Sequence, residues 1–291
     1  MNQIEEWVNL SKDNTELNFR RVVHIVLHAI SSHHELQPEM IMKGGILLAI
    51  IYRTGRYTKD IDFSTPKHYK EFQNGEDEFI RNLENAIKIS AEILPFGLAC
   101  RIQKRELKPG SEGNYQTLHL NIGYALKSQK NEMAKLNAGS SAKVVSIDYS
   151  FNEKVGDIGL VDAGGEDLRT YGQLTVIAEK FRALLQQTSG NGGRRKGSPR
   201  GQDIFDLHTI LTEYPVNPEE YTYLLSLLIS KSKDRDLIVN KNSMSNPEIK
   251  ERSKQRYLQL EDEIDGVLPD FNLAFDALKK FYETLPWADN S

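Results

Sequence analysis

The sequence of 291 residues contains a single cysteine, Cys100. A structural disulfide within the chain and a cysteine-rich zinc site are therefore both excluded, and this cysteine usage is typical of a reducing cytoplasm. No run of about 18 apolar residues occurs, so no membrane-spanning helix is predicted. Residues 1–14 are acidic and polar, whereas a secretory signal peptide begins basic and then becomes apolar. We expect a cytoplasmic protein with no membrane contact.

The chain also lacks an excess of positive charge. Its 37 lysines and arginines are outnumbered by 41 aspartates and glutamates, which gives a formal net charge of −4. A protein that coats nucleic acid over its whole surface is therefore not predicted, and any contact with RNA must come from a local basic patch. Hydrophobic residues make up 39% and charged residues 27%, as in globular proteins with a sizeable core.

A stretch with a clear chemical pattern does occur at residues 40–64, MIMKGGILLAIIYRTGRYTKDIDFS. It predicts a short strand that ends at Gly44 and Gly45, a buried helix that begins on these glycines, and a second strand that contains Asp60 and Asp62. Because side chains on a strand alternate between faces, the two aspartates share one face. Two neighbouring carboxylates repel each other unless a cation lies between them, so the pattern indicates a cation site.

Carboxylate oxygens suit Mg²⁺, or Mn²⁺ in its place, and Mg²⁺ is typically held by one or two carboxylates together with substrate phosphates. Glycines let the backbone approach a ligand, and the N–H groups at the start of a helix attract anions. Lys43, Arg56 and Lys59 add positive charge nearby. Each motif alone has a simpler interpretation: a tight turn for Gly-Gly and a solvated strand edge for Asp-x-Asp. Their combination favours a nucleotide site.

A further carboxylate is predicted on a later strand, residues 142–151, AKVVSIDYSF. Alternation places Asp148 on one face with Val144 and Ser146. A two-metal site for nucleotidyl transfer needs a third carboxylate, because one ion must also hold and activate the attacking hydroxyl. We therefore select Asp148, with Glu153 as the alternative; an aspartate at the rim of the sheet is the simpler interpretation.

The second half of the chain is mainly helical in pattern. Residues 157–172, rich in glycine and aspartate, are predicted to be a connection. Residues 175–187 then predict an amphipathic helix, on which Lys180 by itself would be a surface lysine. The next helix places Asp203 and Asp206 within one turn, where Asp203 by itself would be a helix N-cap. No catalytic constellation appears after this helix.

A basic loop lies between these two helices, at residues 188–202, TSGNGGRRKGSPRGQ. It is poor in apolar residues and holds four positive charges within seven residues: Arg194, Arg195, Lys196 and Arg200. We expect these four side chains to contact the phosphates of an acceptor RNA. A solvated loop without a ligand is the alternative.

Together these motifs resemble the AbiEii/AbiGii-type nucleotidyltransferase toxins, a family of the polymerase-β-like nucleotidyltransferase superfamily. The matching motifs are Lys43-Gly44-Gly45 before an apolar helix, Arg56-Tyr57-Thr58-Lys59-Asp60-Ile61-Asp62-Phe63, Asp148 with Ser150-Phe151-Asn152-Glu153, Glu179-Lys180 before Ala183-Leu184, and Arg200-Gly201-Gln202-Asp203 before Asp206-Leu207. Two positions depart from the family pattern. Ile46 stands where the family often has Ser or Thr, and Gln202 stands where it has Lys.

The resemblance implies an α/β (α+β) fold: a nucleotidyltransferase core with a mixed sheet and covering helices at residues 1–165, then a helical domain at residues 166–291. The implied catalytic residues are Asp60, Asp62, Asp148 and Lys180, of which the three aspartates are the expected metal ligands. The residues expected to bind the nucleotide are Lys43, Gly44, Gly45, Arg56, Thr58, Lys180, Asp203 and Asp206.

The activity implied by the resemblance is Mg²⁺-dependent transfer of a nucleoside monophosphate from an NTP to an acceptor hydroxyl. The protein would be the toxin of a toxin–antitoxin or abortive-infection pair that acts in phage defence. Its acceptor would be the 3' end of tRNA, and its antitoxin would be encoded separately. Transfer to a protein or a small molecule, and a catalytically silent scaffold that binds a partner, are the alternatives. The intact carboxylates argue against the scaffold, and the basic loop favours a nucleic-acid acceptor.

Overall fold

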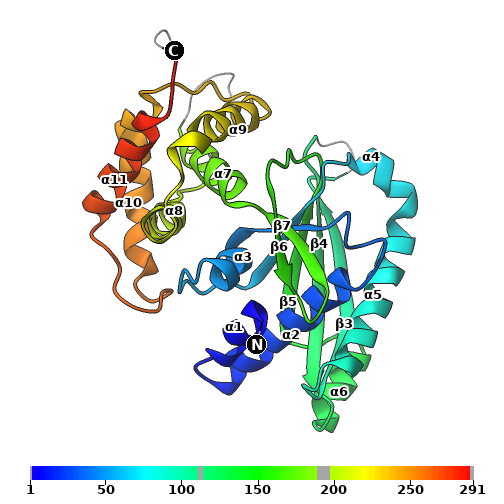
Figure 1. Cartoon of the computed structure of the whole chain (residues 1–291). Coiled ribbons are helices and arrows are strands. Elements are labelled where there is room, and N and C mark those ends of the chain that lie inside the picture. Colours follow the sequence, from blue (N-terminus) through cyan, green and yellow to red (C-terminus); the bar gives the residue numbers. More distant parts are fainter. Residues whose placement is uncertain (1, 111–113, 189–196, 289–291) are drawn as a thin grey trace. The chain divides into compact units, whose positions relative to one another are not determined.

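The computed structural model describes residues 2–110, 114–188 and 197–288. The chain forms two compact units (Figure 1). The first comprises Met1–Ile51 and Thr58–Tyr171, and the second comprises Tyr52–Tyr57 and Gly172–Ser291. The predicted division after residue 165 falls between the last two strands of the first unit, and the structure assigns both strands to this unit.

The first unit contains a seven-stranded mixed sheet with the order β3-β4-β5-β2-β1-β7-β6. The strands are β1 (Ile41–Lys43), β2 (Asp60–Ser64), β3 (Leu98–Lys108), β4 (Thr117–Leu126), β5 (Val144–Ser150), β6 (Ile158–Asp162) and β7 (Asp167–Tyr171). Strand β2 is parallel to β5 and β1 is parallel to β7, whereas the other neighbours are antiparallel. The predicted α/β fold with a mixed sheet is confirmed.

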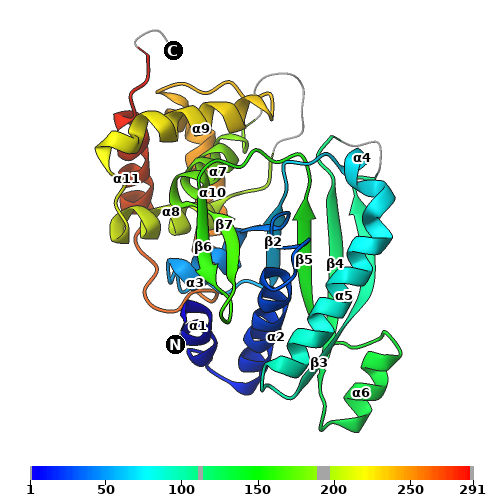
Figure 2. The same ribbon diagram turned by 45° about the vertical axis from the view of Figure 1, so that its right-hand side comes forward.

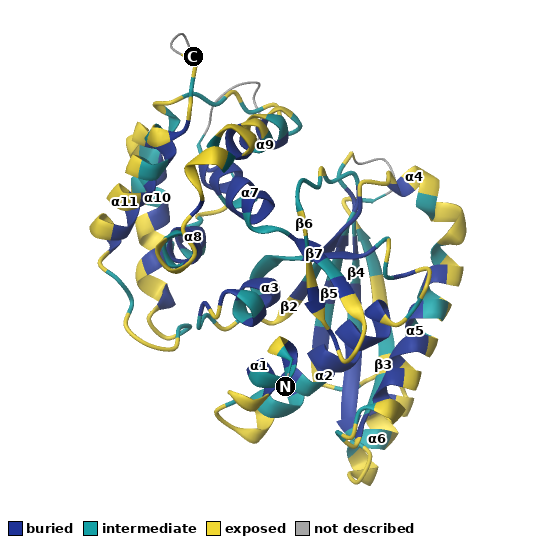
Figure 3. Ribbon diagram, in the orientation of Figure 1, coloured by how far each residue is buried: buried dark blue, intermediate teal, exposed yellow. Residues whose placement is uncertain are grey.

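Two long helices of this unit cover one face of the sheet (Figures 1 and 2). The helices are α1 (Gln3–Asn9), α2 (Asn14–Ser31), α3 (Gly44–Ile51), α4 (Tyr69–Phe72), α5 (Glu76–Ile93) and α6 (Lys130–Asn137). Helix α2 is buried along most of its length (Figure 3). From α5, the ring of Phe79 stacks on Tyr149 of β5 with 5.4 Å between the centroids. Because strand side chains alternate, the residues on either side of Tyr149 point to the opposite face.

The prediction of a connection at residues 157–172 is wrong, because β6 and β7 form an antiparallel hairpin there. Each strand has only five residues, and β6 buries only Val161, so the apolar pattern is weak. The glycines and aspartates form the turn of the hairpin. Gly164 and Gly165 adopt positive φ angles, and their N–H groups donate to Asp162 Oδ1 at 2.9 and 2.6 Å. Turn residues that indicate a loop therefore also close a hairpin.

Helices make up the described part of the second unit: α7 (Gln173–Leu185), α8 (Gly201–Glu213), α9 (Tyr221–Lys233), α10 (Pro247–Tyr257) and α11 (Phe271–Thr284), with short 3₁₀ turns between them. Phe271, Phe275 and Leu278 recur at helical spacing and form the buried stripe of α11. The segment Tyr52–Tyr57 joins this unit by backbone pairing, since Tyr57 N donates to Glu263 O at 2.7 Å.

None of the helices in residues 2–110, 114–188 and 197–288 combines the length and the hydrophobicity that a membrane-spanning segment requires.

Candidate active site

Asp60 and Asp62 lie on β2 as the sequence predicts. Burial alternates along the strand: Ile61 and Phe63 are fully buried, Asp60 is exposed and Asp62 is partly exposed. The two apolar side chains anchor the strand in the core, so both carboxylates emerge on the opposite face of the sheet.

Asp148 is the neighbour of Asp62 across the sheet. Strands β2 and β5 are parallel, and their register pairs Asp60 with Ser146 and Asp62 with Asp148. Paired residues point to the same face, so the three selected aspartates gather on one surface, with roughly 5 Å between the strands. The alternative, Glu153, lies beyond the end of β5, and its carboxylate forms an ion pair with Lys43 Nζ at 3.9 Å.

A histidine that the sequence analysis did not select completes this row. His119 of β4 is paired in register with Asp148, and its Nδ1 lies 2.6 Å from Asp148 Oδ1. The only sequence signal was its place in the alternating run of β4, between the buried Leu118 and Leu120. A lone histidine in such a run carries no motif, and its partner lies 29 residues away.

Gly44 and Gly45 pack directly under the aspartate strand. Gly44 has φ +76°, and a Cβ atom added there would lie 1.9 Å from Asp62 Oδ2. A Cβ atom on Gly45 would lie 2.9 Å from Thr58 Oγ1. The glycine pair is therefore needed to seat Asp62 and Thr58, besides any approach of a ligand to the backbone. Helix α3 begins at this pair, so its first turn lies beside the Asp62 side chain.

The donor set of this face fits a hard divalent cation. Among residues 2–110, 114–188 and 197–288, no three His, Cys, Asp or Glu side chains are grouped so as to hold an ion by themselves. Mg²⁺ does not need such a group, because it usually retains waters and substrate phosphates beside one or two carboxylates. Asp62 and Asp148 supply two neighbouring carboxylates, and Asp60 supplies a third on the same face.

The other selected side chains form a buried cluster in the second unit. Arg56 donates to both oxygens of Asp206, from Nε and Nη2, at 3.1 Å each. Lys180 Nζ donates to Asp203 Oδ1 and Asp206 Oδ2 at 2.7 Å each. We call these four residues the ion-pair cluster. Its two cations and two carboxylates sum to zero charge, so the cluster is balanced without a ligand.

Within the cluster, the surroundings of Lys180, Asp206 and Arg56 favour the charged form of each against the effect of burial. Burial alone would lower the pKa of Lys180, but the carboxylates of Asp203 and Asp206 outweigh it, and the pKa is raised. Burial alone would raise the pKa of Asp206, but Lys180 and Arg56 outweigh it, and that pKa is lowered. The pKa of Arg56 is raised because the attraction of Asp206 exceeds the opposite effect of burial.

Two simpler interpretations from the sequence do not hold here. Lys180 is not a surface lysine, since only 12% of its side chain is exposed. Asp203 is not the N-cap of α8, because the cap position is Arg200 and the Asp203 side chain binds Lys180 instead. The buried Asp203 Oδ2 has no hydrogen-bond partner among the described residues, and Arg200 Nη1 lies 4.0 Å from it.

The remaining basic residues of the loop, Arg194, Arg195 and Lys196, lie outside the described residues.

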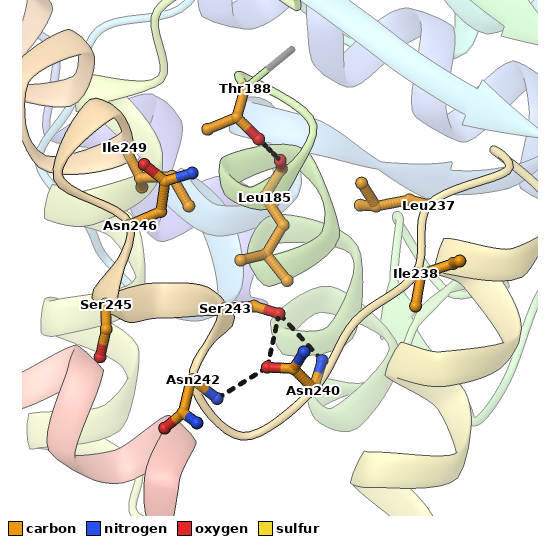
Figure 4. A pocket seen from close by; sticks show the side chains of 10 residues that line it. All are labelled: Leu185, Thr188, Leu237, Ile238, Asn240, Asn242, Ser243, Ser245, Asn246 and Ile249. Atoms are coloured by element: carbon orange, nitrogen blue, oxygen red, sulfur yellow. Dashed lines mark hydrogen bonds between the residues drawn. The ribbon is translucent and has the colours of Figure 1, made fainter. Parts of the chain in front are cut away.

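A separate cavity of about 440 Å³ lies within the second unit (Figure 4). Apolar and amide side chains line it, among them Leu185, Leu237, Ile249, Asn240, Asn242 and Asn246. Asn240 Oδ1 accepts from Asn242 N at 2.9 Å and from Ser243 Oγ at 3.4 Å, so this oxygen is already used within the loop. Because the described residues that line the cavity carry no charge, we do not assign the triphosphate to it.

Comparison with known proteins identifies the family. The model of the family described as Nucleotidyl transferase AbiEii toxin, Type IV TA system, matches residues 25–283. A solved structure of a candidate nucleotidyltransferase from H. pylori has a TM-score of 0.53 and 15% sequence identity, and the match covers 93% of this chain and 96% of that chain. MenT4, a nucleotidyltransferase toxin from Mycobacterium tuberculosis H37Rv, matches at TM-score 0.48 and 13% identity over 97% of this chain and 96% of that one. No curated protein matches the chain.

At 15% identity the H. pylori structure shows a shared fold, whereas the family match covers most of the sequence. Type IV toxin–antitoxin membership implies a nucleotide substrate and an antitoxin partner. This chain is a nucleotidyltransferase and belongs to the AbiEii toxin family of type IV toxin–antitoxin systems.

Proposed function

We propose that this nucleotidyltransferase uses Mg²⁺, or Mn²⁺ in its place, to transfer a nucleoside monophosphate from an NTP to an acceptor RNA. We propose the 3' end of tRNA as the acceptor, a separately encoded antitoxin as the partner, and the cytoplasm as the place of action. The observation that supports the metal is the gathering of Asp60, Asp62 and Asp148 on one face of two adjacent parallel strands. The carboxylates on this face repel one another, and a divalent cation bound by their oxygens would offset the repulsion.

In this proposal the three aspartates hold the divalent cation, which when bound offsets phosphate charge and activates the attacking hydroxyl. The first N–H groups of α3, at Gly44 and Gly45, bind the triphosphate at the positive end of the helix dipole. The acceptor hydroxyl attacks the α-phosphorus, and the bond to the leaving pyrophosphate breaks. The residues of the chain therefore act mainly by orienting the two reactants and balancing charge.

Lys180 is the proposed contact to the leaving phosphates. An ammonium group has three hydrogens, and two of them serve Asp203 and Asp206. The third can donate to a phosphate oxygen while both carboxylates keep the ammonium charged. In this role Arg56 acts on Lys180 indirectly, because it shares the carboxylate of Asp206. Lys43 and Thr58 stay predicted nucleotide contacts.

Transfer is tested by incubating the protein with each α-labelled NTP, Mg²⁺ and purified tRNA, total RNA or a protein extract. We expect label in the tRNA lane, and none with Asp60→Asn or Asp62→Asn. Asp167→Asn is the matched control, since Asp167 is an exposed strand carboxylate on β7. Label in the protein or small-molecule fraction alone would contradict the RNA acceptor. Equal labelling by all four proteins would contradict the metal assignment.

The proposed RNA contact is tested by salt dependence. If Arg194, Arg195, Lys196 and Arg200 each meet a phosphate, changing all four to Ser lowers the slope of log affinity against log salt by about 0.7 per lost contact on a single strand. NTP binding should be unchanged in this variant. Equal slopes for variant and wild type would argue against the loop as the RNA contact.

A further inference from the structure

We infer that His119 is a positioning residue for the cation site: its imidazole fixes the Asp148 carboxylate so that one oxygen is left for the divalent cation. This inference rests on the proposed function of Asp62 and Asp148. The contact that carries it is the 2.6 Å approach of His119 Nδ1 to Asp148 Oδ1. An ionised carboxylate can only accept, so the imidazole donates from Nδ1.

The contact is part of a ladder of polar pairs between β4 and β5. Thr117 Oγ1 lies 3.3 Å from Ser150 Oγ, and Ser146 Oγ donates to Asn121 Oδ1 at 3.4 Å. His119 and Asp148 form the middle pair, and theirs is the shortest of the three distances. The two outer pairs join neutral groups, whereas the middle pair joins an imidazole to a carboxylate, which makes a shorter and stronger hydrogen bond. The ladder thus holds Asp148 from the side opposite to Asp62.

The other carboxylate beside His119 is already engaged elsewhere. Glu106 of β3 is paired with His119 in register, but its Oε2 accepts from Lys104 Nζ at 2.9 Å and lies 3.4 Å from Lys108 Nζ. The imidazole therefore serves Asp148. Since hard cations prefer oxygen donors and Nδ1 is used by the carboxylate, His119 acts through Asp148 and is not itself a ligand.

The physical consequence concerns two like charges. Asp62 and Asp148 are neighbours across β2 and β5. A hydrogen-bond donor on Asp148 reduces the repulsion between the two carboxylates. It also restricts the rotation of the Asp148 side chain. Partners that orient a metal-binding side chain in this way typically contribute 10- to 100-fold to metal affinity or activity. We expect His119 to contribute within this range.

The experiment measures Mn²⁺ binding by electron paramagnetic resonance on the full chain without nucleotide. His119→Leu removes the donor, whereas His119→Asn keeps an N–H donor near the position of Nδ1. Thr117→Val is the matched control, because it removes the neighbouring rung of the ladder and leaves Asp148 alone. We expect the Kd for Mn²⁺ to rise roughly 10- to 100-fold in His119→Leu and to recover in part in His119→Asn. We expect no change in Thr117→Val.

A Kd for His119→Leu within about twofold of wild type, or no recovery in His119→Asn, would overturn the inference. Melting temperatures are recorded for each variant, so that a folding defect is separated from a binding defect. Asp62→Asn separates a failure of the proposed metal site from a failure of the role of His119. If it binds Mn²⁺ as tightly as wild type, the proposed metal site itself is wrong; if it fails to bind while His119→Leu binds normally, only the role of His119 is wrong. A wild-type protein that binds no Mn²⁺ overturns both.

Discussion

The aspartate row of the sheet and the ion-pair cluster of the helical unit place neighbouring carboxylates in opposite surroundings. The row gathers Asp60, Asp62 and Asp148 on one face, partly exposed, with a histidine as the donor to one of them. The cluster buries two carboxylates between Lys180 and Arg56 with zero net charge. The charges of the cluster therefore balance without a ligand, whereas the row is left with neighbouring negative charges, for which we propose a cation.

Because of this difference, we expect removal of one charged side chain to have different effects at the two sites. Removing a partner from the cluster leaves an opposite charge buried, so the folded protein loses stability even without a nucleotide. Removing a carboxylate from the row lowers the repulsion between like charges, so under the proposed function we expect the fold to be kept and the cost to fall on catalysis. Each prediction below tests whether the two sites respond in these opposite ways.

Asp62→Asn should give the largest effect. If Asp62 holds the cation, its loss removes several kcal/mol of transition-state stabilisation, or about a thousandfold in rate. The melting temperature should stay the same or rise slightly, since one of two neighbouring negative charges is gone. Single-turnover transfer of labelled nucleotide and a thermal melt on the same preparation measure both effects. Transfer within a few-fold of wild type would show that the row is not the metal site.

Lys180→Met should lower the free energy of unfolding, which Asp62→Asn should not. It leaves Asp203 and Asp206 buried with one cation fewer, and breaking a buried pair in this way costs roughly 3–5 kcal/mol of unfolding free energy. Urea unfolding of the nucleotide-free protein measures the loss. Lys279→Met is the control, because Lys279 pairs with Glu283 at 3.7 Å on the surface and should cost about 0.5 kcal/mol at most. Equal losses in both variants would contradict a structural role for the cluster.

The sequence predicted the row better than the cluster, for a physical reason. Alternation along a strand is local, so the faces of Asp60, Asp62 and Asp148 could be read directly. The pairing of β2 with β5, and of His119 with Asp148, depends on strand order, which periodicity does not contain.

The ion pairs of the helical unit could not be predicted from the sequence either. Arg56 and Asp206 are 150 residues apart, so neither helical spacing nor composition could show that they meet. The amphipathic pattern of α7 placed Lys180 on the polar side, and its partners Asp203 and Asp206 come from α8, whose position against α7 the pattern does not contain. The hairpin of β6 and β7 was missed because its strands are short and bury few apolar residues.

Gly44→Ala tests how closely the row depends on its backbone support. A left-handed φ of +76° strains any L-residue, and the new Cβ would meet Asp62 Oδ2 at 1.9 Å. Gly139→Ala is the matched control, since Gly139 has φ +69° with no atom near its Cβ position. Both variants should lose about 1–2 kcal/mol of stability from the backbone alone. Gly44→Ala should lose more stability than Gly139→Ala, and it should also lose nucleotidyl-transfer activity, because Asp62 must move. Equal losses of stability and activity in the two variants would show that the contact between Gly44 and Asp62 is unimportant.

The smallest expected effect concerns pH. The loss of unfolding free energy in Lys180→Met should not change between pH 5 and 9. The pKa of Asp206 is lowered in the fold, so its stabilisation is present above the unfolded value of about 3.9 and is lost as the pH falls through the folded value. The pKa of Lys180 is raised, so its stabilisation is present below the unfolded value of about 10.4 and is lost as the pH rises through the folded value. Between pH 5 and 9, therefore, the difference in unfolding free energy between wild type and Lys180→Met should be constant to about 0.5 kcal/mol.

The absolute stability of both proteins should still fall from pH 7 to pH 5. Burial lowers the pKa values of His24 and His28, so their contribution is present above the unfolded value of about 6.5 and is lost as the pH falls below it. Because this term is common to wild type and Lys180→Met, it cancels in the difference. Urea unfolding of both proteins at pH 5, 6, 7, 8 and 9 makes the test. A difference that decreases steadily with pH across this range would show that Lys180 or Asp206 changes protonation there, against the directions of their pKa shifts.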